Sequence, residues 1–345
     1  MNHRTLLLTL EYPPMRGGVA SYLQALHDCL PDVSVYVPRR SRYLWPQWLP
    51  AVFQTWREMH RQGISQIAVS HLLPMGYVAL TFHLFFRTPF FVFVHGLDVA
   101  RAHRSPWKRW WASVILARAK MIIANSEFTK GLVLKYGVME HRVTVITPCI
   151  LTPPDARRAP EAGLILSVGR LVARKNHEAL MRVVATLQRS RPSLRLVILG
   201  DGPQRGVLEQ SLRELNMHDA VTIISNATDA ERDAWYRRAS IFALPTISEG
   251  DDVEGFGVVF LEAAARSIPV VAGCGGGVSE AVVHGVTGLV VDPRSDTEIA
   301  DALRGLLDDP KKAEELGNAA RVRVSEMFTC ASRRRELMKI YGGKS

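Results

Sequence analysis

Short apolar runs alternate with amphipathic segments along the chain, and this alternation predicts parallel β-sheets flanked by helices. In the first half, runs rich in β-branched and aromatic residues predict strands at 5–10, 33–37, 66–70, 90–95, 121–124 and 143–147. Helical periodicity predicts helices near 19–30, 107–119 and 126–136. The segment 147–163 has four prolines and little periodicity, which predicts an interdomain linker.

The alternation begins again after this linker. Strands are predicted at 164–168, 194–199, 221–224, 241–244, 270–272 and 289–291, and helices at 177–189, 204–215, 229–238, 256–266, 296–307 and 311–327. A last amphipathic segment, 331–341, follows the point where the second sheet should be complete. The expected fold class is α/β, with two Rossmann-like domains that face each other across a cleft. A ligand should bind there, at the carboxyl ends of the strands.

The composition is that of a folded protein. Of the 345 residues, 47% are hydrophobic and 22% are charged, which excludes disordered, collagen-like and low-complexity classes. The length exceeds that of one compact core and agrees with two domains. The four cysteines are far apart and form no CxxC pair, so neither a disulfide scaffold nor a cysteine-rich zinc site is expected. This cysteine usage favours a reducing cytosol.

Two apolar stretches bear on contact with a membrane. The run at 6–10 is too short for the hydrophobic part of a signal peptide. The most apolar stretch, 76–86, has about half of the roughly 20 residues needed to cross a bilayer, and it contains His83. Contact with a membrane is therefore expected only at its surface.

The positive charge is confined to the first half of the chain. The formal net charge is +10, and residues 1–150 hold 17 Lys and Arg against 7 Asp and Glu. In the remainder, 26 basic and 26 acidic residues cancel. The first half also holds six of the seven tryptophans. Such a half could bind nucleic acid, an anionic membrane or a phosphorylated substrate, and charge alone does not choose among them.

Glycine-bearing turns follow several of the predicted strands. They are Gly17-Gly18, Val168-Gly169-Arg170, Gly200-Asp201-Gly202 and Gly275-Gly276-Gly277. Such turns allow a backbone to approach a phosphate at a helix N-terminus, although each is also typical of an ordinary tight turn. Counted from Gly200 as the first, the third glycine is Gly206, one residue too late for GxGxxG, which disfavours a dinucleotide-dependent dehydrogenase.

Two cations, Arg170 and Lys175, come between a predicted strand and the next helix. Cations at a helix start oppose the helix dipole, so local stability does not explain Lys175. Neutralising a diphosphate would explain both, because a leaving phosphate gains charge as its bond to a sugar breaks. An exposed basic turn without a ligand is the alternative.

Two carboxylates, Glu254 and Glu262, are eight residues apart in the segment 249–265. Because Gly255 and Gly257 lie between them, we expect Glu254 in a turn and Glu262 on the second turn of the following helix. The apolar neighbours of Glu262 argue against a solvated helix face. Both carboxylates are expected to face the cleft.

Taken in order, these features resemble one enzyme family. The Gly17-Gly18 pair, the His95-Gly96 turn, the Arg170 and Lys175 pair and the E-x7-E motif from Glu254 to Glu262 are similar to those of retaining glycosyltransferases of the GT-B fold, family 4. The resemblance covers nearly the whole chain. It implies an N-terminal acceptor-binding domain at 1–155, a nucleotide-sugar-binding domain at 156–328, and a helix at 329–345 that crosses back to the first domain.

The resemblance also implies roles for individual residues. Arg170 and Lys175 would bind the diphosphate with the Gly18 backbone, Glu262 would bind the ribose, and Glu254 would contact the donor sugar. The catalytic set is His95, Arg170, Lys175 and Glu254; the other donor-binding positions are Gly17, Gly18, Gly202, Ser225, Asn226, Gly255, Phe256, Gly257, Val258 and Glu262; the acceptor-side positions are Tyr12, Asn125 and Ser126. A capping or core histidine is the alternative for His95.

The implied reaction is hexose transfer with retention, by front-face attack of the acceptor hydroxyl. No D-x-D sequence occurs, so the cations would replace a metal clamp, and neither metal nor other cofactor is expected. The string from Asp252 to Gly257 is most similar to phosphatidylinositol-mannoside mannosyltransferases. It favours GDP-mannose as donor and leaves UDP-sugars open. A lipid-linked or polysaccharide acceptor in cell-envelope glycan synthesis is implied.

The acceptor is expected on the basic first domain. Segments 39–48 and 101–111 mix cations with indoles, which suits an anionic membrane, while a solvated surface is the alternative. The location implied is cytoplasmic, peripheral on the cytosolic face of the membrane. Two rival functions remain: a GT-B-fold nucleotide-sugar epimerase, and a nucleic-acid-binding protein. The second lacks any zinc-finger or RNP-like motif, so no nucleic-acid partner is expected.

Overall fold

The computed structural model describes residues 4–15, 17–30, 33–38, 46–150 and 159–341. It divides the chain into two compact units. The first unit consists of Met1–Cys149, Gly250–Phe256 and Cys330–Ser345, and the second of Ile150–Glu249 and Gly257–Thr329. The segment Gly250–Phe256 thus packs with the first unit, although the sequence-based division places it in the second domain.

The first unit is built on a six-stranded parallel sheet of order β2-β1-β3-β4-β5-β6. Its strands are β1 (Thr5–Leu8), β2 (Val33–Tyr36), β3 (Gln66–Ser70), β4 (Phe90–Val94), β5 (Met121–Ala124) and β6 (Val143–Val145). All six predicted strands form and begin at the predicted residue, and four of them end one or two residues earlier than predicted. Because the register is parallel throughout, as in Leu7 opposite Ala68, all carboxyl ends lie at one edge.

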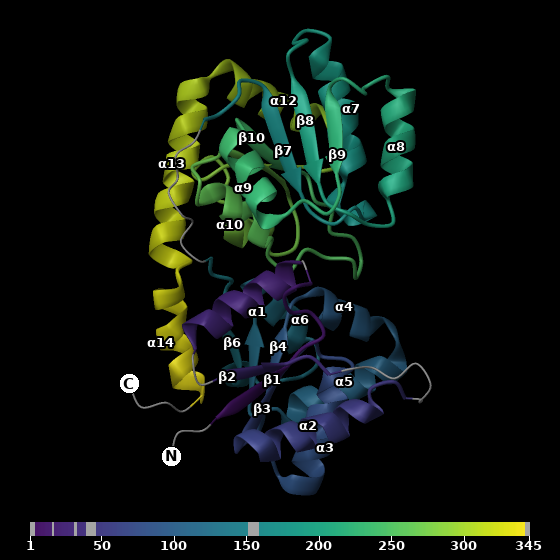
Figure 1. The fold of residues 1–345 in the computed structure, drawn as a ribbon, viewed down its shortest axis with the longest axis vertical. Coiled ribbons are helices and arrows are strands. Elements are labelled where there is room, and N and C mark those ends of the chain that lie inside the picture. The colour runs from purple at the N-terminus through teal and green to yellow at the C-terminus, as the bar shows by residue number, and fades with distance from the viewer. Residues whose placement is uncertain (1–3, 16, 31–32, 39–45, 151–158, 342–345) are drawn as a thin grey trace. The chain divides into compact units, whose positions relative to one another are not determined.

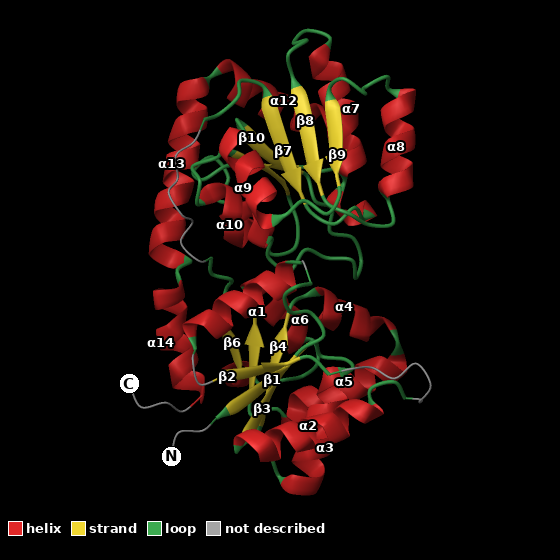
Figure 2. Cartoon of the chain, in the orientation of Figure 1, coloured by secondary structure: helices red, strands yellow, loops and turns green. Residues whose placement is uncertain are grey.

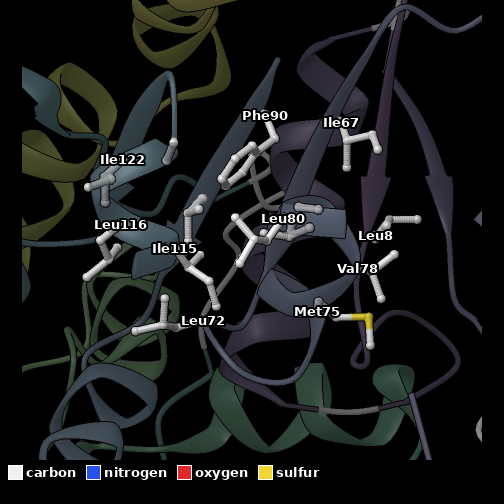
Figure 3. Close-up of a cluster of buried hydrophobic side chains, with 14 of the residues drawn as sticks. Leu8, Ile67, Leu72, Met75, Val78, Leu80, Phe90, Ile115, Leu116 and Ile122 are labelled. Carbon is white, nitrogen blue, oxygen red and sulfur yellow. The ribbon is translucent and has the colours of Figure 1, made fainter. Parts of the chain in front are cut away.

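Helices cover both faces of this sheet (Figures 1 and 2). They are α1 (Gly18–Cys29), α2 (Leu49–Gln62), α3 (Met75–Phe86), α4 (Leu97–Arg104), α5 (Pro106–Arg118), α6 (Glu127–Leu134) and α14 (Cys330–Tyr341), with a 3-10 turn η1 (Glu140–Arg142). Alternate strand residues point to opposite faces: Phe90 packs with α3 and α5 (Figure 3), whereas Phe91 packs with α1 and α14. The C-terminal helix is therefore part of the first unit.

Three helices of the first unit were not predicted. Helix α3 is apolar on nearly all sides and buries Met75, Val78, Ala79 and Phe82, so it carries no amphipathic pattern. Helix α2 begins without a capping side chain, and α4 has only eight residues. Among the described residues, no helix is long and apolar enough to cross a membrane.

One disulfide forms that the cysteine spacing did not predict. A disulfide joins Cys29, at the end of α1, to Cys330, at the start of α14. The two residues are 301 positions apart in the sequence, and only the packing of α14 on α1 brings them together. Spacing rules such as CxxC detect local pairs and do not detect this one.

The second unit has a second parallel sheet, of order β12-β11-β10-β7-β8-β9. Its strands are β7 (Leu164–Val168), β8 (Arg195–Leu199), β9 (Val221–Ile224), β10 (Ile241–Leu244), β11 (Val270–Gly273) and β12 (Leu289–Val291), all as predicted to within a residue. Its helices are α7 (His177–Gln188), α8 (Arg205–Glu214), α9 (Asp229–Arg238), α10 (Val258–Ala264), α11 (Val278–Ala281), α12 (Asp296–Asp308) and α13 (Pro310–Met327), with η2 (Ala173–Lys175) before α7. Only the four-residue α11 was not predicted.

Candidate active site

In the first unit, polar side chains gather at the carboxyl edge of the sheet. His95 follows β4 directly and is 8% exposed, and its Nε2 lies 2.7 Å from Ser70 Oγ at the end of β3. The backbone N–H of His95 donates to Asp98 Oδ1 over 2.9 Å. Burial lowers the pKa of His95 to about 4, despite the nearby Asp98 charge. The imidazole is therefore neutral near pH 7 and available for hydrogen bonding.

A second histidine, His71, lies beside it and was not predicted. Its ring centroid is 5.6 Å from that of His95, and its Nε2 lies 3.6 Å from Glu11 Oε1. Burial opposes the charged ring, but the Glu11 hydrogen bond and the Asp98 and Glu11 charges outweigh it, so the pKa of His71 is raised. Its φ of 78° is in the left-handed region, a strain common at functional sites. The sequence signal was a Ser-His pair at a strand end.

The segment Gly250–Phe256 packs against this edge. A Cβ on Gly255 would lie 2.0 Å from the His95 carbonyl oxygen and 3.0 Å from Asn125 Nδ2, so only glycine fits. Asp251 forms an ion pair with Arg104 of α4, with 2.6 Å between Oδ1 and Nη2. Glu254 is thereby held in the first unit, next to the His95-Gly96 turn, while Phe256 is buried.

The other predicted residues of the first unit have identifiable local contacts. Asn125 Oδ1 accepts from Thr129 Oγ1 at 2.7 Å, and Ser126 caps α6 by accepting from the Thr129 N–H at 2.9 Å. Tyr12 OH lies 2.7 Å from His27 Nδ1, and burial raises the pKa of this tyrosine. Gly17 precedes α1, which begins at Gly18 with no acidic residue in its first turn. The backbone N–H groups in the first turn of α1 suit an anion.

In the second unit, two loops cross at the carboxyl ends of β7 and β8. A Cβ on Gly200 would lie 1.9 Å from the Gly169 carbonyl oxygen, and one on Gly202 would lie 2.4 Å from the Leu171 carbonyl oxygen. The glycines therefore permit this close crossing. For Gly202 the contact is a structural reason for glycine, whatever it contacts in a ligand.

The two predicted cations differ in exposure. Arg170 is exposed, whereas Lys175 is 7% exposed, with its Cε 3.5 Å from the position of a Cβ on Gly169. His177, at the start of α7, lies 3.2 Å from Ser167 Oγ through its Nδ1. Burial, and then the charge of Lys175, lower the pKa of His177 to about 3. The charge of buried Lys175 therefore disfavours protonation of the neighbouring His177.

Glu262 is on the second turn of α10, as predicted, and α9 holds its carboxylate. Tyr236 OH donates to Glu262 Oε2 at 2.8 Å, and Arg232 Nη2 lies 3.9 Å from Oε1. Burial and the Glu262 charge raise the pKa of Tyr236 well above its usual value. The side chain of Glu262 is 13% exposed, so it is not on a solvated face. Neither α9 partner was predicted.

The remaining donor-side positions lie at the ends of β9 and before α10. Ser225 Oγ accepts from Arg205 Nη1 at 2.8 Å, and the exposed Asn226 has a left-handed φ of 57°. Gly257 has a φ of 94° and precedes Val258, the first residue of α10. The E-x7-E motif is thus divided, with Glu254 in the first unit and Glu262 in the second.

The two buried neutral histidines predict how stability depends on pH. His95 and His177 take up protons in the unfolded chain near their usual pKa of 6.5, but in the folded chain only near about 4 and about 3. The free energy of unfolding should therefore fall between pH 7 and pH 5, by about 2 kcal/mol for each. His71, with its raised pKa, acts in the opposite direction. Between pH 7 and pH 5, the free energy of unfolding of His177→Gln, measured with denaturant, should fall by about 2 kcal/mol less than that of wild type. An equal fall in both proteins would contradict the assignment.

Solved structures identify the fold. Sucrose-phosphate synthase from Thermosynechococcus elongatus superimposes with a TM-score of 0.84 at 22% identity, over 99% of this chain and 98% of that one. Anabaena HepE in complex with UDP-glucose gives a TM-score of 0.84 at 19% identity, over 99% and 100% of the two chains. The fold is that of the GT-B glycosyltransferases.

Sequence comparisons then give the family. The model of Glycosyltransferase Family 4 matches residues 1–152, and that of Glycosyl transferases group 1 matches residues 153–323. The GDP-mannose-dependent alpha-(1-6)-phosphatidylinositol monomannoside mannosyltransferase of Mycobacterium tuberculosis H37Rv is 39% identical, over 94% of each chain. The enzyme of that name from Mycolicibacterium smegmatis is 27% identical over 98% of each. This chain belongs to the family 4 glycosyltransferases and is an enzyme of that class; the epimerase alternative is not favoured.

Proposed function

We propose that this enzyme transfers mannose from GDP-mannose to a phosphatidylinositol-mannoside or a closely similar lipid-linked acceptor, with retention of configuration. The observation that carries the proposal is the 39% identity, over 94% of both chains, to an enzyme named for that donor and that acceptor. The predicted motif residues lie at the carboxyl ends of parallel strands in both units, where ligands of such sheets bind.

The proposed step involves front-face attack. The acceptor hydroxyl oxygen forms a bond to the anomeric carbon while the bond from that carbon to the β-phosphate oxygen breaks. The leaving phosphate accepts the hydroxyl proton, and the charges of Arg170 and Lys175 stabilise the diphosphate. Neutral His95, held by Ser70, would donate or accept a hydrogen bond near the transferred sugar. Glu254 would bind sugar hydroxyls, and Glu262 the ribose.

The nucleotide can be identified without an acceptor. A ligand that binds only the folded chain raises its melting temperature in proportion to the logarithm of its concentration over Kd. GDP is expected to raise it more than UDP at equal concentration. A larger shift with UDP would overturn the choice of donor and leave the transferase class intact.

Metal independence is also proposed, because the chain has no D-x-D sequence and places Arg170 and Lys175 after β7. Transfer should therefore survive EDTA with less than about a twofold loss, because fixed cations can supply the phosphate stabilisation. Initial rates with EDTA, with added Mg²⁺ and with neither check this. Complete loss that Mg²⁺ restores would contradict the cation clamp.

We propose that the enzyme binds peripherally to the cytosolic face of an anionic membrane through helices α2, α3 and α5 of the first unit. Helix α3 packs against both others (Figure 1). Exposed apolar side chains lie on all three helices. The most exposed are Phe53, Leu84, Phe85, Phe86, Trp107 and Trp110, from 54% to 77%. Such a set exceeds the isolated exposed apolar residues that are normal on a surface.

Basic groups border these side chains. A cavity of about 360 Å³ is lined by His103, Arg104, Pro106, Arg109, Trp110 and Ser113. It could receive an anionic headgroup while the indoles enter the interface. Within the predicted membrane segments, the ring of the partly exposed Trp111 packs against Tyr77, with 5.5 Å between centroids. Residues 39–45 lie outside the described part of the chain.

Vesicle flotation tests the membrane proposal. A double variant, Trp107→Ser with Trp110→Ser, should bind anionic vesicles at least about 10-fold more weakly than wild type, because two indoles no longer bury apolar area. Val322→Ser, an exposed apolar residue of α13, is the matched control and should bind normally. Absence of wild-type binding at low salt would contradict the proposal, and a salt-sensitive shift with DNA or RNA would favour a nucleic-acid partner instead.

A further inference from the structure

Three cysteines from three remote segments meet in the first unit. Cys29 ends α1, Cys149 follows β6, and Cys330 begins α14. Their sulfur atoms all lie within 4.8 Å of one another. Cys29 and Cys149 are buried, at 6% and 2% exposure, and Cys330 is partly exposed. Neither the predicted catalytic residues nor the proposed membrane surface includes any of them.

We propose that the reduced protein binds one thiophilic divalent cation, such as Zn²⁺, through the thiolates of Cys29, Cys149 and Cys330. The disulfide between Cys29 and Cys330 is then the oxidised, metal-free state of the same site. A reducing cytosol favours the thiol state.

The spacing of the sulfur atoms suits such an ion. With metal–sulfur bonds of about 2.3 Å, tetrahedral ligands are separated by about 3.8 Å, and the three sulfurs are already within 4.8 Å. Once the bond between them is reduced, Cys29 and Cys330 sulfurs can separate to this distance. Because Cys330 is partly exposed, water can take the fourth position.

A cationic side chain beside the three cysteines suits a bound metal ion: the guanidinium of Arg333 interacts electrostatically with Cys149. A bound cation deprotonates its thiol ligands outright. Three thiolates and a divalent ion carry one net negative charge, and the guanidinium of Arg333, 11% exposed, offsets it. Two carboxylates are near: Asp28 interacts electrostatically with Cys149, and Glu336 is paired with Arg333.

The site would fasten the first unit where its chain segments begin and end. Cys149 is the last residue of the first chain segment of this unit, and Cys330 is the first residue of its last segment. Helices α1 and α14, which carry the other two ligands, share one hydrophobic cluster with Leu23, Leu26 and Leu337. The metal would therefore fix α14 onto the unit in the reduced protein, as the disulfide does in the oxidised protein.

The chemistry balances in two steps. A water-soluble trialkylphosphine and one water reduce the disulfide to two thiols, and the phosphine leaves as its oxide. The three thiols then bind one divalent cation and release three protons. After the phosphine is removed without air, Cd²⁺ alone serves as the probe, because cadmium–thiolate bonds absorb in the ultraviolet.

Wild-type reduced protein should gain this absorption up to one equivalent of Cd²⁺, with proton release, and oxidised protein should gain none. Cys149→Ser should weaken Cd²⁺ binding by more than about 100-fold, beyond the loss expected for an outer-sphere partner. Cys274→Ser, at the exposed free cysteine of the second unit, should bind as wild type does. Absorption that persists in Cys149→Ser, or its absence in the reduced wild type, would overturn the proposal.

Alkylation of the wild type gives a test that no variant's folding affects. With Zn²⁺ bound, an alkylating reagent should modify Cys274 at once and leave Cys29, Cys149 and Cys330 unmodified, as read by peptide mass spectrometry. A chelator should then expose all three. Equal modification with and without Zn²⁺ would contradict the site.

Discussion

Replacing Lys175 with Met should lower kcat/KM by about 100-fold or more, because the proposed mechanism then lacks one fixed positive charge that stabilises the leaving diphosphate. Met keeps the aliphatic stem, so the packing of this buried side chain against Gly169 is retained. The same variant should lose most of the rise in melting temperature that GDP causes. Initial rates and thermal shifts on one preparation measure both effects.

The control for this variant is Lys311→Met, an exposed lysine on α13 of the same unit, which should behave as wild type. If Lys175→Met lost activity but kept the wild-type rise in melting temperature with GDP, Lys175 would act in a step other than diphosphate binding. Full activity and an unchanged shift would contradict its role altogether. If the melting temperature without nucleotide is normal, unfolding does not explain the loss.

Replacing Gly255 with Ala should also lower kcat/KM by about 100-fold, through misplacement of the reacting groups. The new Cβ would lie 2.0 Å from the His95 carbonyl oxygen, so the segment that holds Glu254 must move away from the His95-Gly96 turn. This segment is a loop, so the two sheets should remain folded. Kinetics and circular dichroism separate the two effects.

Gly131→Ala is the matched control for this glycine. Gly131 is within α6 of the same unit, and an added Cβ would meet nothing within 4 Å. Because glycine inside a helix is unfavourable, this variant should be slightly more stable, by about 0.5–1 kcal/mol, and fully active. If Gly255→Ala kept normal kinetics, the packing of this segment on His95 would not matter for catalysis.

The sheets could be predicted from the sequence because buried parallel strands are short and almost wholly apolar. Runs such as Phe90–Val94, bounded by polar residues or turns, have few other interpretations. Helix α3 was missed for a related reason: a helix that is apolar on nearly all sides lacks the polar face that reveals helical periodicity. The position of Glu262 on the second turn of α10 could be predicted because Gly257, which precedes the first residue of α10, marks the end of the turn before the helix.

Features that depend on long-range packing could not be predicted. Nothing local indicates that Gly250–Phe256 packs with the first unit, or that Cys29 meets Cys330. His71 was missed because its role depends on a left-handed turn and on Glu11 from another strand end. In each case the partners lie far apart in the sequence, and tertiary structure alone brings them together.

The most direct test of the proposed function is a transfer assay with the full chain, GDP-mannose and phosphatidylinositol monomannoside in anionic vesicles. Mass spectrometry should show the acceptor with one added hexose and an equal amount of GDP, and NMR of the product should show the α-anomeric configuration of the donor retained. Product with inverted configuration would contradict the front-face mechanism. Release of GDP with free or isomerised sugar, and no glycosylated lipid at any acceptor concentration, would contradict the proposed transfer to this lipid.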